Sequence, residues 1–102
     1  MSNVVFEGFN MNKVFTDIMN ADDLNGDEKI ILLAMNFYQQ GSIEGNPAMR
    51  MSVDEISGLI NRSKGTVVRI MKRLIEKEYI ESIRKGQGYP NIYVFKGWRK
   101  WQ

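Results

Sequence analysis

Apolar residues recur every three to four positions in four segments of this chain, a spacing that predicts amphipathic helices. The four segments are residues 11–19, 27–40, 53–60 and 64–77. A run of turn-forming residues, NADDLNG, separates the first two at positions 20–26. The chain is therefore predicted to be mainly helical.

The last two helices have clear start signals. Ser52 precedes Glu55 by three residues, which is the spacing of a capping box. Ser63 is a suitable N-cap for the helix over residues 64–77. The face of that helix expected to pack in the core consists of Val67, Ile70, Met71 and Leu74. The sequence therefore predicts two short helices joined by a turn at residues 61–62.

The helix over residues 27–40 begins with two acidic residues, whose charges suit a helix N-terminus. Its expected buried stripe is Ile30, Leu33, Ala34 and Phe37, with Ile31 and Tyr38 at the margins.

Alternating and β-branched residues predict strands towards the C-terminus. Residues 79–84 and 91–96 form two such runs, joined by the glycine-containing loop KGQGYP, so they predict a β-hairpin. Residues 48–51 suit a brief strand, and residues 41–47 are expected to be a loop.

The predicted fold class is α+β, mostly α, with three core helices, a C-terminal hairpin and an extra N-terminal helix. We expect an N-terminal extension over residues 1–24, a main domain over residues 25–96 and a basic aromatic tail over residues 97–102. The tryptophans of that tail, Trp98 and Trp101, are expected to be packing anchors or a dimer contact rather than base-stacking groups.

Composition narrows the chemistry. The chain has 102 residues with neither cysteine nor histidine, which excludes the usual zinc sites and the histidine-dependent triads. No apolar run approaches the length of a membrane span, and no secretion signal is visible at the start. We therefore expect a cytoplasmic protein that is not an enzyme and needs no cofactor or metal.

Charge divides the chain into two unlike parts. Residues 1–61 carry three cations against nine anions, a net charge of −6, while residues 62–102 carry eleven cations against three anions, a net charge of +8. A basic half on a protein of net charge +2 suggests a surface that faces a polyanion. The alternative is a solvated face whose charges pair with the acidic half.

The run MSVDEISGLINRSKGTVVRIMKRLIEKEYIE resembles the core of bacterial, phage and plasmid winged helix-turn-helix proteins. The upstream run VFTDIMNADDLNGDEKIILLAMNF resembles the helix before that core in plasmid and phage replication initiators and in related small regulators. The resemblance spans residues 14–95 and implies duplex-DNA binding, with residues 64–77 as the recognition helix and residues 84–91 as the wing.

A recognition helix presents its first turns to base edges in the major groove. Lys64, Thr66 and Arg69 are expected there, with Val68 able to meet a thymine methyl group and Arg69 suited to guanine. Gly65 departs from the family pattern, since a side chain could have met a base at this position. Glycine there either allows a close approach of the backbone or reduces the contact surface.

The remaining candidates suit the DNA backbone. Lys72 and Arg73 lie further along the helix, where phosphates are the expected partners. Ser63 is both cap and phosphate ligand, with Arg62 beside it in the turn. The wing would add Arg84, Lys85 and Gln87 towards a backbone or minor groove.

The predicted function is double-stranded DNA binding by a small transcriptional regulator or a replication-associated protein of a phage, plasmid or bacterium. Homodimerisation is expected through the helix of residues 11–19, with Phe6 and Phe9 beside it, or through the C-terminal tail. For the helix, the alternative is packing onto its own core. For the protein, the alternative is a winged-helix interaction module, such as a phage protein that binds a host factor.

Overall fold

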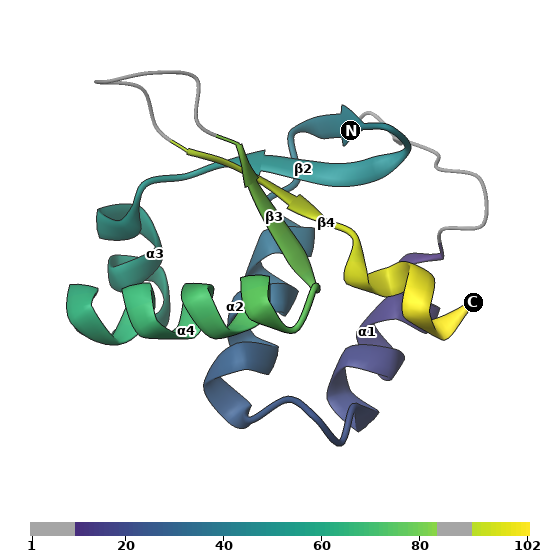
Figure 1. The fold of residues 1–102 in the computed structure, drawn as a ribbon, viewed down its shortest axis with the longest axis horizontal. Coiled ribbons are helices and arrows are strands. Elements are labelled where there is room, and N and C mark those ends of the chain that lie inside the picture. Colours follow the sequence, from purple (N-terminus) through teal and green to yellow (C-terminus); the bar gives the residue numbers. More distant parts are fainter. Residues whose placement is uncertain (1–9, 84–90) are drawn as a thin grey trace.

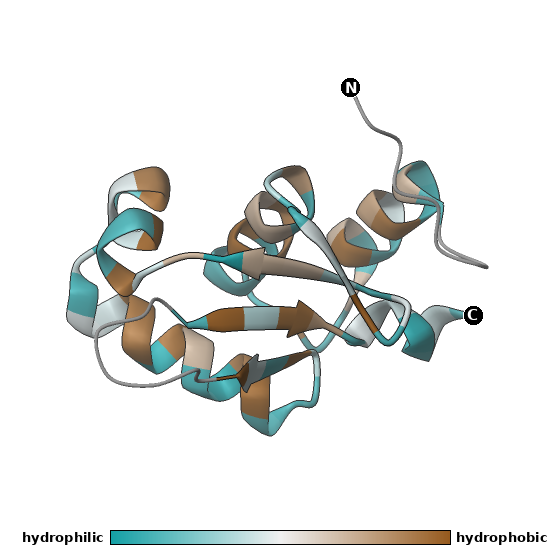
Figure 2. Cartoon of the chain, turned by 90° about the horizontal axis from the view of Figure 1, so that it is seen from above, coloured by the Kyte–Doolittle hydropathy of each residue, from teal (hydrophilic) through white to brown (hydrophobic). Residues whose placement is uncertain are grey.

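The computed structural model describes residues 10–83 and 91–102, and Figure 1 shows their arrangement. Helices and strands follow in the order α1 (Met11–Asn20), α2 (Gly26–Phe37), β1 (Gly41–Ile43), β2 (Asn46–Arg50), α3 (Val53–Ile60), α4 (Lys64–Glu76), β3 (Ile80–Ile83), β4 (Ile92–Phe95) and the 3-10 helix η1 (Gly97–Trp101). The four α-helices lie beneath the sheet in this view, and Figure 2 looks onto the sheet with the helices behind it. The predicted fold class, α+β and mostly α, is confirmed.

The sheet has the strand order β1-β2-β4-β3, and every neighbouring pair is antiparallel. Strand β4 lies between β2 and β3. Its residue Val94 is opposite Ala48 of β2 on one side and Glu81 of β3 on the other. All four residues of β4 are buried, as expected of a central strand. The sheet thereby joins the C-terminal strands to a segment more than forty residues earlier in the chain.

The prediction of a loop over residues 41–47 is wrong, because these residues contribute to a second hairpin. Ile43 pairs with Asn46 across a two-residue turn in which Glu44 and Gly45 have φ values of 52° and 76°. Two successive positive φ angles match the right-handed twist of a hairpin, and glycine adopts such an angle without a steric cost. Strand β2 also begins at Asn46, earlier than the predicted strand at residues 48–51.

The predicted stripe of α2 is also wrong. The residues that α2 buries are Glu28, Ile31, Leu32, Met35 and Asn36, whereas Ile30 is 47% exposed and Phe37 is 72% exposed. The sequence IILLAM offers two adjacent apolar stripes, and helical spacing alone cannot choose between them. Helix α2 ends at Phe37, before the predicted end at residue 40.

The main apolar core lies between the sheet and the helices, and a smaller cluster of Ala48, Ile92 and Val94 is formed by the strands alone. Helix α1 inserts Val14 and Ile18 into the main core, and η1 inserts Trp98, which is 2% exposed. The predicted packing role of Trp98 is thus confirmed, and one face of α1 packs onto its own chain. The indole Nε1 of Trp98 donates to Asn46 Oδ1 at 3.0 Å, which satisfies the buried donor and ties η1 to β2.

Candidate nucleic-acid interface

Helices α3 and α4 are joined by a short turn whose hydrogen bonds are provided locally. The predicted capping box is present: Ser52 Oγ accepts from Glu55 N at 3.1 Å, and Ser52 N donates to Glu55 Oε1 at 3.2 Å. Helix α3 ends at Asn61, which adopts the left-handed conformation that asparagine tolerates. Ser57 Oγ also donates to the carbonyl oxygen of Arg62, so a side chain of α3 holds the turn that follows this helix.

Helix α4 has one buried and one exposed face. Its buried residues are Val67, Ile70, Met71 and Leu74, as predicted. On the opposite side Gly65, Arg69 and Lys72 are exposed, and Val68 is 51% exposed. Residues spaced by three and four positions share one helical face, so these four form a single outer stripe.

The first turn of α4 carries a chain of side-chain hydrogen bonds. Ser63 Oγ accepts from Thr66 N at 3.2 Å, which confirms the predicted N-cap. Ser63 Oγ also donates to Thr66 Oγ1 at 2.9 Å, and Arg69 Nη2 donates to the same oxygen at 3.2 Å. Three of the predicted site residues are therefore linked along one side of the helix.

Two cations near the start of α4 pair with carboxylates of other helices. Arg62 Nη2 lies 3.1 Å from Asp27 Oδ1 of α2, and Lys64 Nζ lies 3.0 Å from Asp54 Oδ1 of α3. The Lys64 and Asp54 side chains are 68% and 69% exposed. Such exposed pairs contribute about 0–1 kcal/mol, so an incoming phosphate can replace the carboxylate.

Towards the end of α4 the cations turn inward instead. Lys77 Nζ lies 3.0 Å from both carboxylate oxygens of Glu28, and Arg73 Nε lies 3.7 Å from Glu28 Oε2. The Glu28 side chain is only 1% exposed. Arg73 therefore has a partner within the protein, although its side chain remains 47% exposed.

Asp23 and buried Tyr79 lie next to this cluster, and Lys77 Nζ also donates to the carbonyl oxygen of Asp23. The phenol oxygen of Tyr79 donates to the Asp23 carboxylate, with oxygen–oxygen distances of 2.7 and 2.8 Å. Burial raises the pKa of Tyr79 above its ordinary value, and the hydrogen bond and negative charge of Asp23 raise it further. These groups hold the start of α2 against the end of α4.

The candidate residues thus divide into three groups. The structure brings together seven of them at the start and along the outer face of α4: Arg62, Ser63, Lys64, Thr66, Val68, Arg69 and Lys72. Arg73 lies beside Glu28, and the wing candidates Arg84, Lys85 and Gln87 lie outside the described residues. Pairing with the acidic half was the alternative that the charge pattern offered, and Asp27 and Asp54 provide such pairs, although no local spacing identifies these two carboxylates because they belong to other helices.

In the described part of the chain, no three Asp or Glu side chains gather where they could hold a metal ion. The helices of residues 10–83 and 91–102 include none long and apolar enough to cross a membrane.

Comparison with known proteins identifies the fold. No protein-family model and no curated protein matches this chain. A solved structure of a Rep–DNA complex is similar over 93% of this chain and 82% of its own, with a TM-score of 0.55 and 23% identity. The N-terminal domain of a DNA-binding protein is similar over 92% of this chain and 83% of its own, with a TM-score of 0.54 and 18% identity. The chain therefore has the fold of these two proteins, in agreement with the winged-helix resemblance of its sequence.

Proposed function

We propose that this chain binds double-stranded DNA by placing the first turns of α4 in the major groove. The observation that supports this most directly is the outer stripe of α4, where Arg69 and Lys72 are exposed next to Gly65 and Val68. A helix fits the major groove, and its N-terminal residues reach base edges there. The fold shared with a Rep–DNA complex supports the same assignment.

Each side chain has a role that follows from its chemistry. Arg69 makes a bidentate contact with guanine, and Val68 contacts a thymine methyl group. Lys72 and Arg73 contact phosphates, and Ser63 marks the N-terminus of α4, which favours a phosphate. Arg62 and Lys64 exchange their exposed carboxylate partners for phosphates, which carry negative charge at higher density. The wing residues Arg84, Lys85 and Gln87 contact the backbone or the minor groove.

Between the two predicted roles, we propose a replication-associated protein rather than a transcriptional regulator. The likeness to a Rep–DNA complex supports this choice, because it extends over 93% of this chain rather than over the helix-turn-helix alone. The proposed DNA binding also implies a location where DNA is accessible, in the bacterial cytoplasm or nucleoid.

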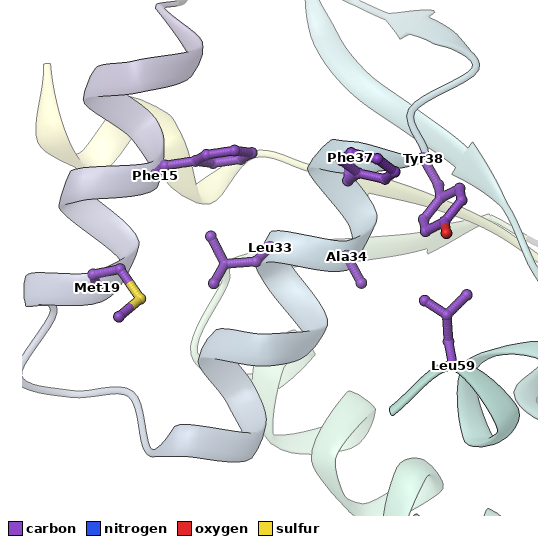
Figure 3. Close-up of a pocket in the computed structure, with 7 residues that line it drawn as sticks. All are labelled: Phe15, Met19, Leu33, Ala34, Phe37, Tyr38 and Leu59. Carbon is purple, nitrogen blue, oxygen red and sulfur yellow. The ribbon is translucent and has the colours of Figure 1, made fainter. Parts of the chain in front are cut away.

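We also propose that the protein dimerises through an apolar patch on α1, α2 and α3 (Figure 3). The patch consists of Phe15, Met19, Leu33, Ala34, Phe37, Tyr38 and Leu59. Met19 is 57% and Phe37 72% exposed, an unusual degree of exposure for large apolar residues that line one patch. No residue of α4 belongs to the patch, so a dimer formed there leaves the recognition helix free.

Duplex binding is tested by titrating the protein against a labelled random-sequence duplex pool at two salt concentrations and sequencing what it retains. We expect an enriched motif and an affinity that falls steeply with salt. The double variant Arg69→Ala, Lys72→Ala should lose at least tenfold in affinity with little change in melting temperature. Lys96→Ala, Lys100→Ala is the matched control, because it removes the same charge outside the outer stripe, beside the C-terminal end of α4, where Lys100 Nζ donates to the carbonyl oxygen of Lys77. Equal losses in both double variants would overturn the assignment to α4.

The dimer is tested by sedimentation velocity on Phe37→Ser. This variant should shift the wild-type dimer towards monomer, whereas Val68→Ser, which changes an exposed apolar residue outside the patch, should not. A wild-type protein that is monomeric at all concentrations would overturn self-association. With duplex binding also absent, that result would favour the alternative of a protein-interaction module.

A further inference from the structure

The guanidinium group of Arg69 differs from the neighbouring cations in what holds it. Arg62 and Lys64 each pair with a carboxylate, and Arg73 lies near one. Among the described residues, Arg69 forms no ion pair, and its one side-chain hydrogen bond goes to the neutral oxygen Thr66 Oγ1 at 3.2 Å. Its positive charge is therefore uncompensated within the part of the protein that the structure describes.

Thr66 is itself held in place. Its backbone N–H and its Oγ1 both bond to Ser63 Oγ, at 3.2 and 2.9 Å, and the residue is half-buried on α4. Oγ1 accepts from both Ser63 and Arg69, which uses the two lone pairs of a hydroxyl oxygen. Its position is fixed by the backbone of α4 and by the N-cap, and so it is a rigid anchor.

Such an anchor has a specific effect on arginine. An unrestrained arginine side chain populates many rotamers, and it loses part of this freedom when it makes a directional contact. A hydrogen bond from one Nη2 proton limits the side chain beforehand and leaves the other guanidinium protons available. A carboxylate partner would restrain the side chain equally but would also neutralise it and occupy the edge that reads a base.

The surroundings of Arg69 leave room for a base edge. Gly65 lies one turn earlier on the same outer stripe, and a Cβ added there would meet no atom within 4 Å. Packing within the described residues therefore does not require glycine at this position, although glycine inside a helix is destabilising relative to alanine. A missing side chain beside Arg69 allows the DNA to approach the helix closely.

We propose that Thr66 is a positioning residue that orients Arg69 to read one guanine in the major groove. This inference rests on the proposed DNA binding and assigns a specificity function to Thr66 through its hydroxyl oxygen rather than through a contact with DNA. Thr66 sets the direction of the guanidinium group, Gly65 admits the base pair, and Ser63 fixes Thr66.

The test uses the duplex selected by the wild-type protein and versions with each G·C pair changed in turn to A·T. For the wild type, one such change should weaken binding about 5- to 160-fold, which corresponds to the 1–3 kcal/mol of a bidentate contact. Arg69→Ala identifies that pair, because it should show no discrimination there. Thr66→Val keeps the shape and the backbone bond to Ser63 but removes the acceptor, and should reduce the discrimination at the same pair at least threefold. Thr66→Ser, which restores a hydroxyl, should recover most of it.

The possible results distinguish the positioning role of Thr66 from duplex-DNA binding itself. Full discrimination in Thr66→Val, or an equal loss of affinity for every sequence, would overturn the positioning role while duplex binding stands. The same holds if no G·C pair depends on Arg69. A wild-type protein that retains no duplex overturns the proposed function, and this inference with it. Thermal melts followed by circular dichroism confirm that each variant folds.

Discussion

The cations at the two ends of helix α4 form ion pairs of the same length in different surroundings. Lys64 Nζ lies 3.0 Å from Asp54, and Lys77 Nζ lies 3.0 Å from Glu28. The first pair is 68% and 69% exposed, whereas the second is 34% exposed at the lysine and 1% exposed at the glutamate. Distance alone does not distinguish the two pairs, but burial does.

Burial decides what each pair can do. Water screens the exposed pair, so it contributes little to folding and its lysine remains available to another anion. The buried carboxylate has no water to replace a lost partner, and removing that partner leaves polar groups unsatisfied. We therefore expect the start of α4 to serve binding and its end to serve stability.

The largest expected effect is at Glu28. Glu28→Gln keeps the volume of the side chain but removes the charge that faces Lys77 and Arg73. We expect the free energy of unfolding to fall by about 2–3 kcal/mol, below the usual cost of breaking a fully buried pair because Lys77 can still reach water. Urea denaturation measures the change.

Glu81→Gln is the matched control for this experiment. Glu81 pairs with Lys96 at 2.7 Å, a shorter distance than the Glu28 contacts, but both side chains are about half exposed. The free energy of unfolding should change by less than about 0.5 kcal/mol. Similar losses in the two variants would contradict the argument that burial separates the two kinds of pair.

A smaller effect concerns Tyr79, which belongs to the buried end. Burial and the Asp23 carboxylate raise the pKa of Tyr79, so the folded state keeps the phenol proton longer than the unfolded state does. The resulting stability is complete below pH about 10, the pKa of an unfolded tyrosine, and is lost as pH rises further towards the folded value. From pH 9 to pH 11 the loss should be about 1 kcal/mol.

Variants at single tyrosines separate the contribution of Tyr79 from that of other groups that lose a proton at alkaline pH. Urea denaturation at several pH values should show a weaker alkaline loss of stability in Tyr79→Phe than in the wild type. Tyr38→Phe, at a tyrosine that is 45% exposed, should keep the wild-type dependence. Identical pH profiles for all three proteins would show that Tyr79 does not contribute.

The sequence was most informative where one local signal determines the structure. The Ser52 capping box, the Ser63 N-cap and the buried face of α4 depend only on residues within about one to three helical turns. Because α4 has charged residues on every side except one, its pattern allows a single orientation. This is why the residues brought together on its outer face could be chosen before the structure was known.

Prediction failed where a choice depended on distant packing. Helix α2 has two apolar stripes, and contact with α4 and the sheet determines that Ile31 and Met35 are buried while Phe37 is exposed. The turn at Glu44 and Gly45 was missed because its strands are short and lack an alternating apolar pattern. Because α2 buries the stripe with Ile31 and Met35, its other apolar stripe contributes to the exposed patch in Figure 3.

The smallest change in stability is expected at Asp54, whose exposed pair with Lys64 lies at the start of α4. Asp54→Asn removes the partner of Lys64, and the free energy of unfolding should change by less than about 0.5 kcal/mol. Duplex affinity should instead rise a few-fold, because a phosphate no longer competes with a carboxylate for the lysine. Fluorescence anisotropy at 0.1 M salt measures the affinity.

Glu81→Gln serves again as the control, because it makes the same change in net charge on strand β3. Charges separated by more than about 10 Å are largely screened at this salt concentration, so only a carboxylate close to the bound DNA should matter. A rise confined to Asp54→Asn would assign Lys64 to the phosphate contact. An equal rise in both variants would mean that net charge, rather than the exchange of one partner for another, controls binding at this end of α4.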